Sequence, residues 1–115
     1  MEYKIIITKR FEEKYLDWMK KYFTKNKFIE ILKSKKHKFI WLQDPFEKYK
    51  IKINWVDFRG VVFLISWNKV IPLFLYMKKD KNNGFNISWI NNKNQIKLEH
   101  TFATKDIENG LFEVY

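Results

Sequence analysis

The sequence contains no cysteine and only three glycines among its 115 residues. Without cysteine, disulfide frameworks, zinc ribbons and thiol nucleophiles are excluded, and a cytoplasmic location fits this composition. Three separated glycines cannot form the loop that cradles phosphate, and no Gly-x-Ser-x-Gly elbow is present. Neither His37 nor His100 has a second ligand at metal spacing, and no acidic cluster suggests a magnesium nuclease. We therefore expect a protein without metal or cofactor, in which both histidines are structural or solvated.

Targeting segments and linkers are also missing. Charged and apolar residues alternate over residues 1–20, so no signal peptide or membrane span is visible. The length suits one ordinary domain, and 46% hydrophobic and 19% aromatic residues are enough to fill its core. We expect a single domain over residues 1–115, with a core in 1–84, an extension in 85–115 and no membrane partner.

Arginine is scarce in this strongly basic chain. The formal net charge is +10, yet only Arg10 and Arg59 are arginines among the 23 basic residues. The excess positive charge lies in residues 1–81, whereas residues 82–115 carry three lysines and four acidic residues. A basic body attracts polyanions such as RNA, DNA or an acidic protein, although an AT-rich genome would also enrich lysine without selection for binding. Because a planar guanidinium suits phosphate better than an ammonium does, we expect the two arginines to have specific roles.

The N-terminal third predicts one strand and two helices. Residues 3–7 are rich in β-branched side chains and suit a strand, and Thr8 suits the N-cap of the next helix. A helix is predicted over roughly residues 9–22, with one apolar stripe formed by Phe11, Tyr15, Trp18, Met19 and Tyr22. A shorter second helix contains Phe28, Ile31 and Leu32. It ends in a basic run over 33–38 that is either a solvated helix end or a phosphate-contacting edge.

Residues 48–77 predict a three-strand meander around which the chain is organised. Polar and apolar residues alternate over 48–55, which places Lys48, Lys50 and Lys52 on one face and the apolar residues in a core. Residues 59–66 are almost continuously apolar, as expected of a strand covered on both faces, and Arg59 enters that strand. Pro72 cannot donate a ladder hydrogen bond, so it predicts an edge position or a bulge.

Shorter elements flank the meander. A short strand is predicted over residues 39–42, and residues 78–84 form a polar loop. Residues 85–90 and 95–100 flank the sequence Asn-Asn-Lys-Asn, which predicts a C-terminal hairpin. One helical turn over 104–108 closes at Gly110, and residues 111–115 are extended. The expected fold is α+β, with two N-terminal helices packed on a small, mainly antiparallel sheet in the order strand, helix, helix, meander, and with the extra C-terminal hairpin.

A site of cations and aromatics can cleave RNA without a metal ion. The substrate supplies its own nucleophile, the 2′-hydroxyl, and the protein aligns it, stabilises the phosphorane and moves two protons. A lysine crowded by other cations has a lowered pKa and can act as a general base, whereas arginine keeps its charge and can hold the phosphoryl oxygens. Lys50, Lys52 and Arg59 supply these residue types, although lysines on an exposed strand face are more often inert.

At these positions the chain resembles the RelE-like toxins of bacterial and archaeal toxin–antitoxin pairs. The resemblance covers about residues 1–84. It lies in Tyr49-Lys50-Ile51-Lys52, in Phe58-Arg59 seven residues on, and in the apolar strand and hairpin that end at Lys78-Lys79. The opening residues 5–11 and the two helices that follow also look like that family.

The resemblance implies a small α+β domain that cleaves mRNA in the ribosomal A site, leaves a cyclic phosphate and is held inactive by a cognate antitoxin. Lys50 and Lys52 would bind substrate and assist as base, and Arg59 would stabilise the transition state. The later basic residue of the family falls on Lys78 or Lys79, and its C-terminal tyrosine falls near Phe85. The expected catalytic set is therefore Lys50, Lys52, Arg59 and Lys79, and the expected RNA-binding set is Lys48, Lys78, Lys81 and Phe85.

Two other functions remain open. ParE-type toxins share the scaffold and poison DNA gyrase by protein contact, without a catalytic cluster. The third possibility is a non-catalytic nucleic-acid-binding domain whose C-terminal segment builds an interface. The Lys50-x-Lys52 pair followed by Arg59 favours the ribonuclease.

Overall fold

The computed structural model describes residues 4–20, 22–33, 39–41, 48–53, 58–66, 68–77 and 89–115. Along the chain these form β1 (Lys4–Thr8), α1 (Lys9–Phe11), η1 (Glu12–Leu16), α2 (Asp17–Met19), α3 (Lys25–Lys33), β2 (Phe39–Trp41), β3 (Lys48–Ile53), β4 (Phe58–Ser66), β5 (Lys69–Met77), α4 (Trp89–Glu108) and β6 (Phe112–Val114). The segments α1, η1 and α2 follow one another directly and make one N-terminal helix, in which η1 is a π-helical turn.

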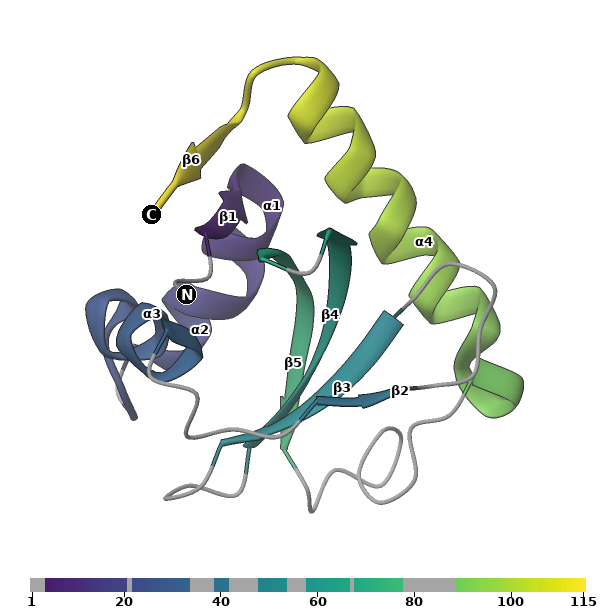
Figure 1. Cartoon of the computed structure of the whole chain (residues 1–115), viewed down its shortest axis with the longest axis horizontal. Coiled ribbons are helices and arrows are strands. Elements are labelled where there is room, and N and C mark those ends of the chain that lie inside the picture. The colour runs from purple at the N-terminus through teal and green to yellow at the C-terminus, as the bar shows by residue number, and fades with distance from the viewer. Residues whose placement is uncertain are drawn as a thin grey trace.

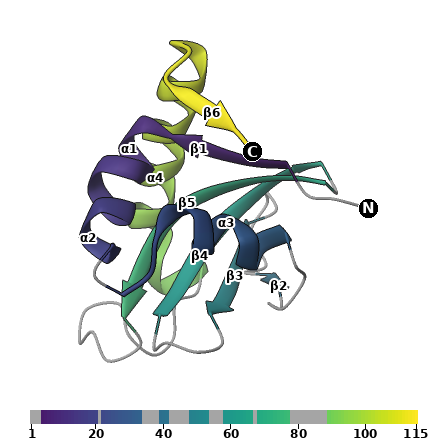
Figure 2. The ribbon, with the colours of Figure 1, turned by 90° about the vertical axis from the view of Figure 1, so that its left-hand side faces the viewer.

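The strands form one six-stranded sheet in the order β2-β3-β4-β5-β1-β6. β1 runs parallel to β5, and every other neighbouring pair is antiparallel. Figure 1 shows α2 and α3 on one side of the strands and α4 on the other, and Figure 2 shows the same arrangement from the side. The predicted α+β class, the mainly antiparallel sheet and the meander β3-β4-β5 are confirmed.

The N-terminal helix begins where predicted, at the Thr8 cap. The Oγ1 atom of Thr8 accepts a hydrogen bond of 3.2 Å from the backbone N–H of Phe11. Phe11, Tyr15 and Met19 are buried as predicted, but Trp18 is 45% exposed, and so is Tyr22 just beyond the helix. The prediction for Trp18 was wrong because the π-helical turn of η1 adds a residue to the repeat and shifts the apolar stripe. The prediction for Tyr22 was wrong because the helix ends at Met19 and not near residue 22.

The second helix is also confirmed, and of the two alternatives predicted for Pro72, an edge position or a bulge, the structure has the bulge. The buried side chains of α3 include Phe28, Ile31 and Leu32. In β5, Pro72 lies opposite Val62 whereas Phe74 lies opposite Val61, so Leu73 is the extra residue of a β-bulge. Pro72 is thus accommodated inside the sheet by the bulge.

The predicted C-terminal hairpin is wrong. Residues 89–108 form α4, whose inward side buries Ile96, Glu99 and Ala103 at helical spacing. Asn92 departs from helical geometry (φ −122°, ψ 19°), so the polar sequence that suggested a turn makes a kink instead. The last turn of α4 includes the helical turn predicted before Gly110, and β6 lies in the segment predicted to be extended.

Candidate functional site

The register of the central strands aligns two of the predicted site residues, Lys52 and Arg59, with Tyr76. Lys52 of β3 lies directly opposite Arg59 of β4, and Arg59 lies opposite Tyr76 of β5. We call these three positions the Arg59 row. Lys50 lies opposite Val61 in the second row, and Lys48 lies opposite Phe63 in the third. The sheet therefore brings the backbones of the predicted Lys52 and Arg59 positions together, although they are seven positions apart in sequence.

Tyr76 is the partner of Arg59 that the sequence did not suggest. Its side chain is buried, and burial raises the pKa of the Tyr76 phenol to about 12. The positive charge of Arg59 opposes this rise in the pKa of Tyr76. Arg59 itself is half-buried. At neutral pH the row therefore holds the guanidinium of Arg59 opposite a neutral phenol.

The face of β4 that carries Arg59 is covered further along the strand. Side chains alternate along a strand, so Val61 and Phe63 share the face of Arg59. Val61 is buried, and the ring of Phe63 lies 4.9 Å from the ring of His100 on α4. Since four residues of a strand span about 13 Å, the site at Arg59 lies well away from this contact. The central strand at this face is therefore partly covered.

A second cluster of functional groups joins the N-terminal helix to α4. The Nε and Nη2 atoms of Arg10 donate hydrogen bonds of 2.9 and 2.8 Å to the two carboxylate oxygens of Glu99. The hydroxyl of Tyr15 donates a third hydrogen bond, of 2.9 Å, to Oε1 of Glu99. The Nζ atom of Lys14 lies 3.6 Å from the same oxygen. The hydrogen bond to Glu99 raises the pKa of Arg10; burial, followed by the charge of Glu99, raises the pKa of Tyr15.

Arg10 has a structural role. Its guanidinium lies 3.9 Å from the centre of the Phe102 ring, and its backbone N–H donates a 2.8 Å hydrogen bond to Asp106. The scarcity of arginine correctly indicated a specific role for this residue, but the partner is a buried carboxylate and not phosphate. Sequence alone could not reveal Glu99, because the partners are 89 residues apart.

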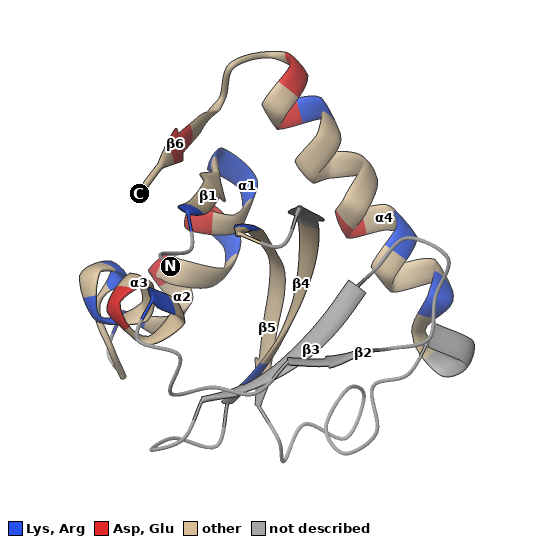
Figure 3. Cartoon of the chain, viewed as in Figure 1, with Lys and Arg blue, Asp and Glu red and all other residues tan. Residues whose placement is uncertain are grey.

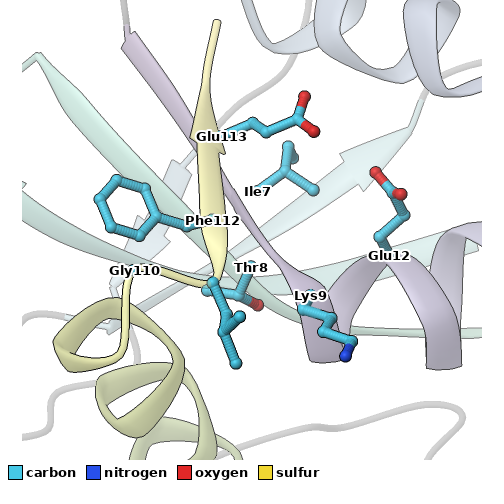
Figure 4. A pocket seen from close by; sticks show the side chains of 8 residues that line it. Ile7, Thr8, Lys9, Glu12, Gly110, Phe112 and Glu113 are labelled. Carbon is cyan, nitrogen blue, oxygen red and sulfur yellow. The ribbon is translucent and has the colours of Figure 1, made fainter.

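Two pockets lie between the N-terminal helix and the C-terminal part of the chain. One, of about 270 Å³, is lined by Ile7, Thr8, Lys9, Glu12, Gly110, Leu111, Phe112 and Glu113. Figure 4 shows the carboxylates of Glu12 and Glu113 on one side of this pocket and Phe112 on the other. Lys25 forms ion pairs with both carboxylates. The other, of about 580 Å³, lies beside Arg10 and Phe102. Neither pocket includes a predicted site residue.

The remaining predicted residues fall outside the part of the chain that the structure describes. These are Lys78, Lys79, Lys81 and Phe85. Within the described ranges, no group of three His, Asp or Glu residues is placed to hold a metal ion. Among those same residues, no helix is both long and apolar enough to cross a membrane.

Comparisons with family models, with curated proteins and with solved structures returned no match for this chain. Its function therefore has to be inferred from its own residues and their arrangement. The Arg59 row combines a guanidinium, a neutral phenol and a lysine position on adjacent strands, which is a set suited to binding and stabilising a phosphoryl group.

Proposed function

We propose that this protein is a metal-independent endoribonuclease and the toxin of a toxin–antitoxin pair of the RelE type. The observation that carries the proposal is the register that sets Lys52 opposite Arg59 on adjacent antiparallel strands. Residues directly opposite one another in such a pair are the closest cross-strand neighbours in a sheet. A base and a phosphate ligand on these two positions can act on the same phosphodiester.

The proposed reaction needs no group beyond the RNA and the protein. The 2′-oxygen attacks the adjacent phosphorus, the bond from phosphorus to the 5′-oxygen breaks, and the products are a 2′,3′-cyclic phosphate and a 5′-hydroxyl. Lys52, with Lys50 beside it, takes the proton of the 2′-hydroxyl, and Arg59 stabilises the negative charge of the phosphorane. Lys79 is the proposed proton donor to the 5′-oxygen, and Lys48, Lys78, Lys81 and Phe85 are proposed RNA contacts.

Tyr76 adds a positioning role to this proposal. The proposed role is that the buried, neutral phenol opposite Arg59 limits the directions open to the guanidinium without competing for its charge. Substitution of Tyr76 by phenylalanine should therefore lower the cleavage rate less than the loss of Arg59 does. Because Arg59→Lys keeps the charge and loses the fork geometry, that variant should recover only part of the activity.

The proposed partners in the cytoplasm are the ribosome with its mRNA and an antitoxin. An acidic or amphipathic segment of the antitoxin would cover the face of β3 that carries Lys48, Lys50 and Lys52. Expression without the antitoxin should arrest growth and cut ribosome-bound mRNA while naked RNA stays largely intact. Normal growth with intact message at high expression would overturn the proposal, and loss of DNA supercoiling with intact message would indicate a ParE-like gyrase inhibitor.

The decisive test is single-turnover cleavage of ribosome-bound mRNA by purified Arg59→Ala. Losing a transition-state contact of this kind costs about 3–4 kcal/mol, so the rate should fall on the order of a hundredfold or more. Lys69→Ala, at an exposed position of β5, is the matched control and should cut at the parent rate. Melting curves of both variants separate activity from folding. A folded Arg59→Ala variant that cuts at the parent rate contradicts the proposal.

A further inference from the structure

The basic residues of α4 lie on its exposed side, and two of its acidic residues lie on the inward side. From Lys93 to Glu108 the helix carries three lysines and three acidic residues. All three lysines are exposed, whereas Glu99 is buried and Asp106 is half-buried. Both of these acidic residues accept hydrogen bonds from Arg10. A helix that is neutral by sequence therefore presents a basic side to solvent.

This outward face of α4 can be defined by its exposed residues, which are Lys93, Asn94, Lys97, Leu98, Thr101, Thr104, Lys105 and Glu108. Figure 3 shows blue segments recurring along the ribbon of α4. Glu108, at the C-terminal end, is the single acidic residue of the outward face. The stretch from Lys93 to Lys105 spans about 18 Å of helix.

We propose that the outward face of α4 binds the phosphate backbone of double-helical RNA. Lysines on one surface that bind a polyanion release its condensed counterions, which provides affinity without any requirement for sequence. The assignment to RNA, and not to DNA, rests on the proposed ribonuclease function. A helical RNA contact outside the cleavage site would hold the protein on a structured RNA while the Arg59 row acts on an unpaired strand.

The composition of the outward face favours a double helix over a single strand. Proteins that bind unpaired nucleotides stack the bases on aromatic side chains. No aromatic residue lies on the outward face, and Phe102 packs under the guanidinium of Arg10 instead. The hydroxyls of Thr101 and Thr104 donate 2.9 Å hydrogen bonds to the carbonyls of Lys97 and His100. The positive charge of the outward face is therefore carried by its three lysines, which are exposed.

The test compares two triple variants that remove the same charge. Lys93→Gln, Lys97→Gln and Lys105→Gln are combined in one protein, and Lys4→Gln, Lys20→Gln and Lys69→Gln, all at exposed positions, are combined in the other. Glutamine is nearly as good a helix former as lysine, so α4 should remain folded, which circular dichroism checks. Binding to a labelled RNA hairpin is measured by fluorescence anisotropy over a range of salt concentrations.

Each phosphate contact contributes roughly 0.9 to the slope of log K against log salt for a duplex. The α4 triple should therefore lose about two to three units of slope, and the control triple less than about one. Glu108→Gln should strengthen binding to the hairpin, whereas Glu30→Gln, an equal change of charge at an exposed position of α3, should do so less.

Equal effects of the two triples would overturn the inference, because binding would then depend on net charge alone. A loss confined to unpaired RNA, or a loss seen with a DNA duplex and not with the RNA hairpin, would also overturn it. The result is distinguishable from failure of the proposed function, since hairpin binding by Arg59→Ala should keep the parent salt slope whether or not that variant cleaves mRNA.

Discussion

Arg10 and Glu99 are joined by two parallel hydrogen bonds of 2.9 and 2.8 Å across 89 residues of sequence. The pair fastens α4 to the N-terminal helix, and the side chain of Glu99 is only 4% exposed. Tyr15, the third partner of Glu99, also packs 6.4 Å from the ring of Phe74, the residue opposite Val61. The attachment of α4 is thus linked by direct packing to the strands that carry the candidate site.

Replacing Glu99 by glutamine should destabilise the protein by about 3 kcal/mol. Removing one partner of a buried ion pair costs 3–5 kcal/mol, and partial exposure of Arg10 places the expected cost near the lower value. Urea unfolding measures the change in unfolding free energy, and hydrogen exchange should show that the amides of α4 lose protection first.

The matched control is Glu30→Gln, because Glu30 is exposed and lies 3.5 Å from Lys27. That change should alter stability by less than about 0.5 kcal/mol. A similar small change in Glu99→Gln would mean that the pair does not hold α4. Replacing Arg10, Tyr15 and Glu99 together by Met, Phe and Leu should recover part of the loss, because no buried charge is then left unpaired.

Substitution of Gly110 should lower the stability of the protein because of its backbone conformation alone. Its φ is +72°, the left-handed conformation, and an added Cβ would meet nothing within 4 Å. The N–H groups of Gly110 and Leu111 donate to the carbonyls of Ile107 and Asp106, which is the Schellman pattern that ends a helix. Gly110→Ala should cost about 1 kcal/mol in thermal or urea unfolding, and Gly110→Asn less. An alanine variant as stable as the parent would contradict this explanation.

Stability should fall at alkaline pH through Tyr76. Burial raises its pKa in the folded state to about 12, whereas tyrosine in an unfolded chain ionises near about 10. Below pH 10 the stability contributed by Tyr76 is fully present, because its phenol is neutral in both the folded and the unfolded state. Between pH 10 and 12 the unfolded chain loses the proton and the folded one keeps it, so stability falls by up to about 1.4 kcal/mol per pH unit.

Urea unfolding of the parent and of Tyr76→Phe at pH 9, 10 and 11 measures this effect, and a comparison at pH 7 accounts for any difference in packing. The Tyr76→Phe variant should show a shallower decline above pH 10. Tyr15 acts in the same direction, since its pKa is also raised, so the decline should be reduced and not abolished. Identical declines in the two proteins would exclude Tyr76 as a source.

Strong local patterns by themselves determined much of this fold. Thr8 as a cap, the apolar period of α3 and the strands of the meander follow from local sequence patterns. Pro72 predicted an edge position or a bulge, and the place of β5 between β4 and β1 left the bulge. The alternation around Lys50 and Lys52 was likewise enough to predict β3, and the glycine at position 110 was enough to predict where the last helix ends.

Tertiary structure decided what depends on distant partners. The sequence Asn-Asn-Lys-Asn favours a turn locally, but Ile96 and Ala103 bury their side chains and Glu99 reaches Arg10 only if residues 93–108 are helical. Hydrogen bonds from Arg10 hold Glu99 and Asp106 on the inward side of α4, whereas the lysines of this helix are exposed. A count of charges along the sequence cannot reveal this arrangement. The placement of Tyr76 beside Arg59 also needed the sheet, because cross-strand neighbours are set by register and not by proximity in sequence.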